Sequence, residues 1–474
     1  MTVLYPTIQD YESHYDPGWL KPFPEVDREY VWTYPISLRA MTGAELCRPS
    51  VDLPSNNRLS IYVHIPYCQS ECPFCAFLHV AAKVDFTRYA NCVAKEAGWY
   101  AHHPCSRNTT LSAIYFGGGT ASLLRPAHIA RILGAIREGY RTHPNLEVTV
   151  ECHPDSIDSA YLSALPPLGV TRLSLGIQSF QPRFLRAIGR KQNVANATAI
   201  LDQALQAEFR TVSIDLMYRL PKQTNTDVLN DLRCATRAGV QSISMYSLEA
   251  SDTLFESRGA AAQPDEAAGR HAFESIRHYL CDAGYVHFAQ PDYALPGHEQ
   301  RYLTDLWCAP QAMNLGLGAG AMSGFFAGFT YCNLHDPDLY MQAVETNSLP
   351  ILLGQRLDRR ECLARYLVLG VRGLQVPLSP FEELFGVPAS EPFRTAIEKL
   401  TSLGLVAVTD DRLALTSNGE YYVDTVSKHF YTERNHGKRQ PWGCHFQHFR
   451  PTGLFSMSHL WERSVNNERD ESRV

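Results

Sequence analysis

The sequence predicts an α/β fold built on a parallel β-sheet, because short apolar runs alternate with helical segments along its central part. The runs are almost continuously apolar, which is typical of strands that are buried on both faces. They lie at residues 59–65, 113–116, 146–151, 172–177, 211–217 and 242–248. Six repeats of strand and helix imply right-handed crossovers in a sheet that is either doubly wound or barrel-like. Periodicity alone does not separate these two forms.

The segments between the runs have the spacing of amphipathic helices. These helices are expected at 84–101, 126–139, 194–207 and 226–238, with a further one at 264–283. A glycine-rich stretch, LGLGAGAMSG, follows at 315–324. We therefore expect a core unit over 58–250 and an extension of it over 251–350.

The two ends of the chain differ from this core. Residues 1–57 are rich in aromatic residues and prolines, and they predict an irregular arm that packs on another part of the molecule. Residues 351–431 predict two helices and then a strand pair around Asp410–Asp411, which is a small winged-helix-like α+β unit. Residues 432–474 are polar and lack a period, so we expect a partly disordered tail.

The composition limits the class of protein. Of the 474 residues 45% are hydrophobic and 19% are charged, and the net charge of −6 argues against nucleic acid as a partner. The chain shows neither a signal-peptide pattern nor a run of 18 apolar residues, so we expect no membrane span. Its 13 cysteines have no regular framework. They predict reduced thiols in a cytoplasmic protein, some of them ligands.

The most specific motif is YVHIPYCQSECPFCAF at 62–77, in which Cys68, Cys72 and Cys75 have the spacing C-x3-C-x2-C. Three thiolates leave a [4Fe–4S] cubane one cysteine short, so one iron stays open to a chelating ligand. The amine and carboxylate of S-adenosylmethionine (SAM) can occupy that iron, and one electron then cleaves SAM to a 5′-deoxyadenosyl radical. A zinc site is the alternative, but zinc prefers four ligands in paired C-x2-C clusters, and the sequence has no second pair.

The chain resembles the radical SAM branch that includes oxygen-independent coproporphyrinogen III dehydrogenase. The resemblance runs from about Tyr30 to Tyr431 and depends on a series of blocks in one order: YVHIP, GGGT (117–120), VECHPD, LGIQSF, AIGRKQ, SIDLMYRLPKQT, HFAQPDYALPG and LGLGAGAMS. It implies a partial (β/α)6 barrel over 58–250. It also implies an N-terminal arm and, over 351–431, the winged-helix-like C-terminal domain of that family.

The resemblance also implies cofactors: a [4Fe–4S] cluster on the three cysteines and two SAM molecules in each chain. The positions that match those holding the cluster-bound molecule are Tyr62, Gly118, Glu151 and Met322. The positions that match those around the second molecule are Phe74, Gly119, Thr120, Gln178, Arg190, Asp215 and Glu249. The residue types agree in part, because Glu151 and Asp215 at strand ends can accept from ribose hydroxyls and Arg190 can pair with a carboxylate.

Two departures from the dehydrogenase pattern shape the expected reaction. The dehydrogenases carry a cysteine two residues after the third one, where this chain has Phe77. The segment YSLEASDTLF at 246–255 is similar to haem chaperones and class C radical methylases. We predict a class C-like enzyme that C-methylates or cyclopropanates an sp2 carbon of a natural-product intermediate, as in antibiotic biosynthesis. The alternatives are coproporphyrinogen III oxidation, anaerobic haem ring opening and, outside enzymes, a haem chaperone.

The expected partners are a small-molecule substrate and a reductant such as flavodoxin or ferredoxin, and we expect a monomer. Near the C-terminus, Cys444, His445 and His448 form a pattern that can ligate a metal or haem iron. The same region, with Trp442 and His459, suits an amphipathic tail that packs aromatic side chains over the barrel mouth. We favour the tail and predict no metal there.

Overall fold

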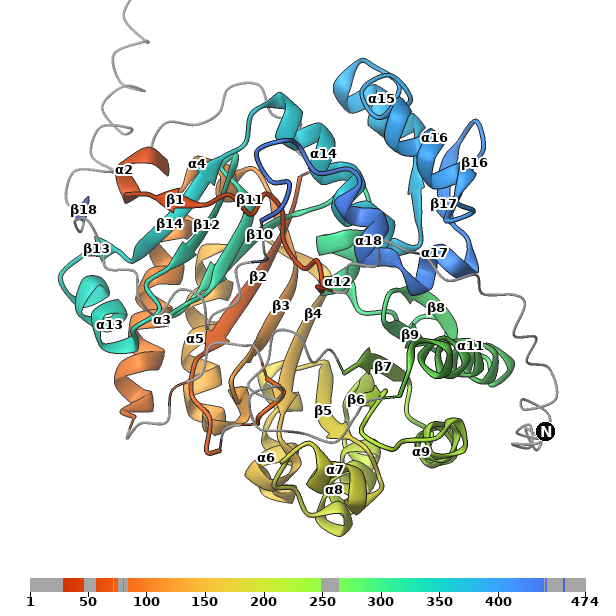
Figure 1. Ribbon diagram of the computed structural model, residues 1–474. Coiled ribbons are helices and arrows are strands. Elements are labelled where there is room, and N and C mark those ends of the chain that lie inside the picture. Colours follow the sequence, from red (N-terminus) through yellow and green to blue (C-terminus); the bar gives the residue numbers. More distant parts are fainter. Residues whose placement is uncertain are drawn as a thin grey trace, which may run out of the picture.

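A computed structural model of the chain confirms the α/β class and centres the molecule on a 13-stranded sheet (Figure 1). The structure describes residues 29–46, 57–70, 72–75, 80, 84–248, 264–438, 440 and, for the backbone alone, 455–456. Across the sheet the strands are β1 (Arg39–Ala40), β14 (Ile351–Arg356), β12 (Phe329–Asn333), β11 (Met322–Phe326), β10 (Met313–Leu317), β2 (Arg58–Ile65), β3 (Thr110–Gly118), β4 (Thr142–Cys152), β5 (Arg172–Gln178), β6 (Thr211–Tyr218), β7 (Ser242–Ser247), β9 (Asp292–Ala294) and β8 (Val286–Ala289).

The centre of this sheet is parallel, from β10 through β2 to β7. From β2 to β7 the spatial order of the strands is their chain order, which is the topology of a barrel, whereas a doubly wound sheet reverses its order. Antiparallel strands extend both edges: β11, β12, β14 and β1 on one side, β9 and β8 on the other. No pairing joins β1 to β8 within the described ranges, so the barrel is partial as predicted.

Helices follow the parallel strands: α3 (Phe86–Ala101) and α4 (Pro104–Arg107) after β2, α5 (Pro126–Gly139) after β3, α6 (Ser159–Ala164) after β4, α7 (Pro182–Ala187) and α8 (Val194–Gln206) after β5, α9 (Asn225–Ala238) after β6, and α11 (Glu266–Asp282) after β7. The five predicted helices all exist, with ends within two residues of expectation. Polar N-caps explain where they begin. Asp85 accepts from the backbone N–H of Arg88 at α3, and Thr224 and Asp227 form a capping box at α9.

The C-terminal unit is the expected mixture of helices and a small sheet, and it lies to one side of the large sheet (Figure 1). Its elements are α14 (Arg359–Gly370), β15 (Gln375–Pro377), α15 (Ser379–Phe385), α16 (Arg394–Ser402), β16 (Val406–Val408), β17 (Arg412–Leu415), α17 (Ser417–Tyr421) and α18 (Val423–Lys428). Strands β15 and β16 both pair antiparallel with β17. Strand β14 pairs with β12 in the large sheet, although the sequence predicts that the C-terminal unit begins at 351.

The described part of the N-terminal arm packs against this C-terminal unit. Its buried side chains include Val31, Tyr34 and Ile36, which lie in the same hydrophobic cluster as the core of that unit. The side chain of Asn435 accepts from the backbone N–H groups of Ile36 and Ser37, each at 2.9 Å. The arm is therefore held by side-chain acceptors and ends in β1 and α2 (Gly43–Leu46).

Further elements complete the described fold: α12 (Arg301–Trp307), α13 (Pro337–Glu345), β13 (Ser348–Leu349) and its partner β18 (Phe455–Ser456). None of the helices that the structure describes has the length and apolar character needed to cross a bilayer. The start of the predicted tail is packed, because Asn435 and Gln440 are buried. Trp442, Cys444, His445, His448 and His459, which the sequence marks as a tail cluster, lie outside the described residues.

A buried carboxyl group joins α3 to the neighbouring α13 and to the strands beside β2. Glu96 is fully buried and accepts from the Tyr340 hydroxyl at 2.6 Å, the Asn333 amide at 2.7 Å and the Gly318 backbone N–H at 2.9 Å. These partners come from α13, β12 and the turn between β10 and β11. Burial raises the pKa of Glu96 to about 7, although the three hydrogen bonds favour the charged form.

The first prediction follows from this shift. The unfolded carboxyl has a pKa near 4.5, so between pH 4.5 and 7 the native state holds a proton that the unfolded chain has released. The contribution of Glu96 to stability is therefore present below pH 4.5 and falls as the pH rises to 7. Compared with Glu96→Gln, the free energy of unfolding of the unmutated protein should fall by about 3 kcal/mol across this window.

Urea titrations at several pH values measure this difference. Glu398→Gln, which changes an exposed carboxyl on α16, is the matched control. A difference between the unmutated protein and Glu96→Gln that stays constant from pH 4.5 to 8 would contradict the prediction.

Candidate active site

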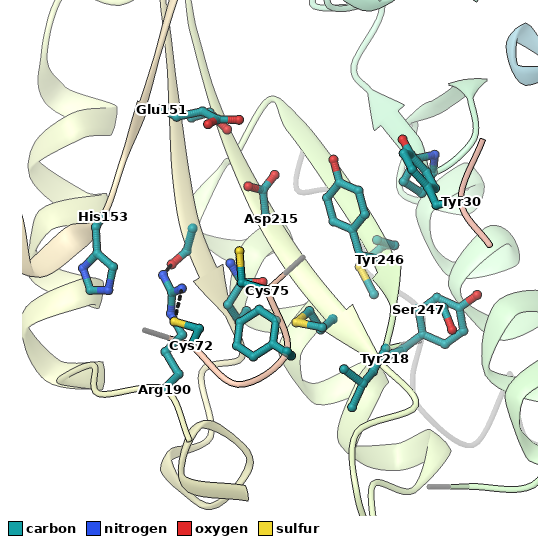
Figure 2. A pocket seen from close by; sticks show the side chains of 18 of the residues that line it. Tyr30, Cys72, Cys75, Glu151, His153, Arg190, Asp215, Tyr218, Tyr246 and Ser247 are labelled. Carbon is teal, nitrogen blue, oxygen red and sulfur yellow. Dashed lines mark hydrogen bonds between the residues drawn. The ribbon is translucent and has the colours of Figure 1, made fainter. Parts of the chain in front are cut away.

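A cavity of about 490 Å³ lies at the carboxyl ends of the parallel strands (Figure 2). This is the edge at which barrels of this type present their functional loops. Eleven of the predicted site residues line it: Cys68, Cys72, Phe74, Cys75, Gly118, Gly119, Thr120, Glu151, Gln178, Arg190 and Asp215. They come from segments spread over more than a hundred residues of sequence, and the parallel sheet gathers them.

Three predicted residues are placed differently. Tyr62 packs its ring on Tyr115 at 5.9 Å and shares a 3.3 Å hydrogen bond with His64, and it does not line the cavity. Met322 is buried at the start of β11 and does not line the cavity either. Glu249 lies outside the described residues. The assignment of these three to bound SAM stays a prediction.

The three cysteines follow β2 in a loop whose base is closed by backbone hydrogen bonds. Val80 donates to the carbonyl of Pro66 at 2.6 Å, and Cys68 donates to the carbonyl of Val80 at 3.5 Å. The N–H of Cys75 reaches the carbonyl of Cys72 at 3.0 Å, which makes a tight turn between them. The base of the loop is thus fixed to the sheet while all three cysteines line the cavity.

The glycine loop after β3 approaches the cysteine loop very closely. A Cβ atom on Gly119 would lie 2.7 Å from the carbonyl oxygen of Tyr67 and 3.0 Å from Cys68 Sγ, so a larger residue does not fit without a shift. Gly118 has a φ of 116°, which favours glycine. Thr120 donates its hydroxyl to Cys68 Sγ at 3.5 Å. These contacts explain why GGGT follows this strand.

Two carboxyl groups face the cavity from neighbouring parts of the barrel. Burial raises the pKa of Glu151 to about 7, and repulsion by Asp215 adds to this, whereas hydrogen bonds from Tyr115 and the Gly118 backbone oppose it. Burial raises the pKa of Asp215 to about 6, and the positive charge of Arg190 opposes that shift. Both groups are therefore ready to ionise when a ligand offers hydroxyl donors or positive charge.

Arg190 connects the second carboxyl group with the cysteine loop. Its guanidinium donates to the carbonyl of Gly176 at 2.6 Å and to the side chain of Gln192 at 2.8 Å. A third, longer contact of 3.9 Å reaches Cys72 Sγ (Figure 2). The sequence predicts that Arg190 pairs with a ligand carboxylate; the structure shows in addition that it joins the end of β5 to the cysteine loop.

The far wall of the cavity contains lining residues that the sequence analysis did not single out. The guanidinium of Arg372 lies 4.2 Å from the centre of the Tyr30 ring and donates to Asp424 at 2.6 Å. The Tyr246 ring at the end of β7 lies 6.5 Å from that of Tyr30 in an edge-on contact (Figure 2). The arm and the C-terminal unit thus complete the cavity. The aromatic residues of the predicted arm, among them Tyr30, were the sequence feature that could have indicated this wall.

The cysteine loop fits a [4Fe–4S] cluster by the chemistry of its donors. Cys68, Cys72 and Cys75 line one cavity, and two of the sulfurs receive hydrogen bonds from Thr120 and Arg190. Throughout the described ranges, no three His, Cys, Asp or Glu side chains are grouped closely enough to hold a single metal ion. A cubane does not need such a group, because each thiolate binds a different iron. The fit of the cluster therefore depends on the three cysteine side chains and on the groups that donate hydrogen bonds to them.

The comparisons with known proteins agree with this site. A family model described as "Radical SAM superfamily" matches residues 62–235, and one described as "HemN C-terminal domain" matches 357–421. A bovine mitochondrial relative, radical S-adenosyl methionine domain-containing protein 1, is 30% identical over 342 residues, which cover 68% of this chain and 75% of that protein. The chain belongs to the radical SAM superfamily.

Two further relatives of this radical SAM protein are named as a haem chaperone and a coproporphyrinogen oxidase. Heme chaperone HemW of Mycobacterium tuberculosis is 28% identical over 375 residues, covering 77% of this chain and 93% of the chaperone. The oxygen-independent coproporphyrinogen III oxidase of Salmonella typhimurium is 26% identical over 395 residues, covering 78% and 84%. The solved coproporphyrinogen III oxidase (HemN) of Escherichia coli has the same fold, with a TM-score of 0.70, 23% identity and coverage of 82% and 92%.

These findings support only part of the predicted recognition. The superfamily and its coproporphyrinogen dehydrogenase branch agree with the sequence prediction. None of the relatives described above is named as a methylase, so the predicted class C methylase character gains no support. The superfamily implies a [4Fe–4S] cluster and SAM, together with a reductant and a small-molecule substrate.

The second prediction concerns the cysteines of this radical SAM protein. Changing Cys68, Cys72 or Cys75 to Ala should abolish both the iron–sulfur absorbance of the reconstituted protein and its 5′-deoxyadenosine production, because each thiolate holds a separate iron. Cys234→Ala, which removes an exposed thiol on α9, is the control and should keep both. Normal iron content in all three loop variants would contradict the assignment.

Proposed function

We propose that this protein is an enzyme that binds a [4Fe–4S] cluster and two SAM molecules in its cavity and abstracts a hydrogen atom from a small-molecule substrate beside them. When bound, the cluster and SAM supply the 5′-deoxyadenosyl radical that takes the hydrogen. The electron is expected from a donor protein such as flavodoxin or ferredoxin.

The observation that carries this proposal is the presence of two adjacent sets of polar residues in one cavity. Glu151 lies against Gly117 of the glycine loop, and that loop reaches Cys68 through Gly119 and Thr120, although the resemblance implies these last two residues for the second molecule. Gln178 and Arg190 lie against Gly176, and Arg190 reaches Cys72. The charge of Asp215 acts on both Arg190 and Glu151. Each set offers hydrogen-bond partners for a ribose or an amino acid carboxylate. The arm and the C-terminal unit cover the far wall, which helps to exclude water from a reactive radical. This enclosure favours an enzyme over a chaperone without turnover.

The first candidate reaction is the oxidation of a substrate of the coproporphyrinogen class. The support comes from the relatives, because the Salmonella protein and the E. coli structure have that name and match this chain over most of their length. The product of such a reaction loses hydrogen and carboxylate and gains no carbon.

The second candidate is carbon transfer from SAM to an sp2 carbon, and two observations favour it. Phe77 stands where the dehydrogenases have a cysteine. The charged residues that line the cavity are mostly acidic: Glu29, Glu151, Asp155, Asp215 and Asp424 against Arg190, Lys191 and Arg372. Both arginines already bind protein acceptors. An acidic lining suits the cationic sulfonium of SAM and disfavours a substrate with several carboxylates.

The third prediction separates these reactions. The reconstituted enzyme is incubated with coproporphyrinogen III, methyl-deuterated SAM and dithionite. We expect an unlabelled product and one 5′-deoxyadenosine for each carboxylate lost. Label in a product, with one S-adenosylhomocysteine formed per carbon transferred, would reverse the order of the two candidates. Haem binding with little 5′-deoxyadenosine would instead indicate a chaperone.

The fourth prediction tests the two sets of polar residues. Glu151→Ala should lose most 5′-deoxyadenosine even without substrate, roughly 10²-fold or more, because Glu151 belongs to the set that would orient the cleaved molecule. Arg190→Ala and Asp215→Ala should still form 5′-deoxyadenosine slowly while losing substrate turnover. Both products are measured by liquid chromatography and mass spectrometry. Unchanged turnover in Arg190→Ala and Asp215→Ala would show that the second set is misplaced.

A further inference from the structure

Gln178 has an unusual backbone conformation at the end of β5. Its φ is 66°, in the left-handed region that non-glycine residues rarely adopt, and the pairing of β5 with β6 shifts register between Gly176 and Gln178. Such a conformation persists when the surrounding structure holds it, and it is concentrated at functional sites. Gln178 lines the cavity in the set of residues that we propose for the second SAM molecule.

Two side chains from the segment after α7 fix the backbone on the N-terminal side of Gln178. Arg190 donates to the carbonyl of Gly176 at 2.6 Å, and the Gln192 amide donates to the carbonyl of Ile177 at 2.9 Å. The two carbonyl groups that precede Gln178 are therefore both fixed.

The other side is held by Asp231, a carboxyl group of α9 that is only 2% exposed. It accepts from the Ser179 hydroxyl at 2.7 Å, the Phe180 backbone N–H at 3.0 Å and the Gln181 amide at 3.2 Å. The three residues that follow Gln178 thus converge on one carboxylate. Asp231 itself does not line the cavity.

We infer that Asp231 is a positioning residue for the second SAM molecule, acting through the strained turn at Gln178. The inference rests on the proposed function, because it requires two SAM sites. Without the acceptor at 231, the turn can relax to an ordinary strand end, and the Gln178 side chain then leaves its place in the cavity. If Asp231 had a purely structural role and only attached α9 to the barrel, its loss would weaken the binding of both SAM molecules equally or of neither.

The test measures the binding of radiolabelled SAM to the anaerobically reconstituted enzyme by equilibrium dialysis. The unmutated enzyme should bind two molecules per chain. Asp231→Asn should still bind one, and its affinity for the other should fall about tenfold or more, since hydrogen bonds to a charged group are lost. Slow 5′-deoxyadenosine formation should persist in this variant. Asp227→Asn, which changes a neighbouring carboxyl of α9 that pairs with Arg183, is the matched control and should bind two molecules.

A double-mutant cycle shows whether Asp231 acts through Gln178. Gln178→Ala should weaken the same binding event, and the double variant should be no weaker than Gln178→Ala alone. Ser179→Ala, which removes one of the three donors, should give a smaller loss and guards against a folding defect in Asp231→Asn.

The failing outcomes are distinct. Two molecules bound with unchanged affinity in Asp231→Asn, equal weakening of both, or additive losses in the double variant would overturn the inference alone. A single molecule bound to the unmutated enzyme would overturn the two-site proposal and this inference with it.

Discussion

Parallel strands that end at one edge are the constraint on which the whole site depends. The cysteine loop leaves β2, the glycine loop leaves β3, and Glu151, Gln178 and Asp215 stand at or near the ends of β4, β5 and β6. Because each crossover returns the chain to the same direction, six successive strands deliver their last residues to one cavity. The helices between them are needed for this geometry, and none of them has to contribute a ligand.

The close approach of these loops imposes a second constraint, which is electrostatic. Glu151 and Asp215 are half-buried in one cavity, and the repulsion between them raises the pKa of Glu151 beyond the effect of desolvation. Arg190 compensates on the side of Asp215 while also reaching Cys72. The guanidinium of Arg190 therefore interacts with the turn at Gly176, with the carboxyl group of Asp215 and with the cysteine loop. Replacing it would disturb all three contacts at once.

Sequence patterns predicted the parts of the molecule that depend on local order. The strands from β2 to β7 and the longer helices follow from periodicity. Eleven residues that the family resemblance implies for the site line the cavity, and their roles toward bound SAM stay predictions. Contacts between distant segments left no such signal. Val31 binds Asp424 across 393 residues, and Ser179 binds Asp231 across 52. The left-handed φ of Gln178 was equally hidden, since glutamine does not mark such a turn.

The two halves of the cavity are attached to the fold in different ways, and this bears on how function diverges. The cluster side is built from the ends of core strands, so changing it disturbs the barrel. The far wall comes from an arm fixed by the side chains of Asp424, Asn435 and Gln440, which accept backbone N–H groups of the arm whatever its side chains are. Arm residues such as Tyr30 can therefore change without loss of these anchors. A wall of this kind can change its lining side chains while the barrel and the cysteine loop stay as they are.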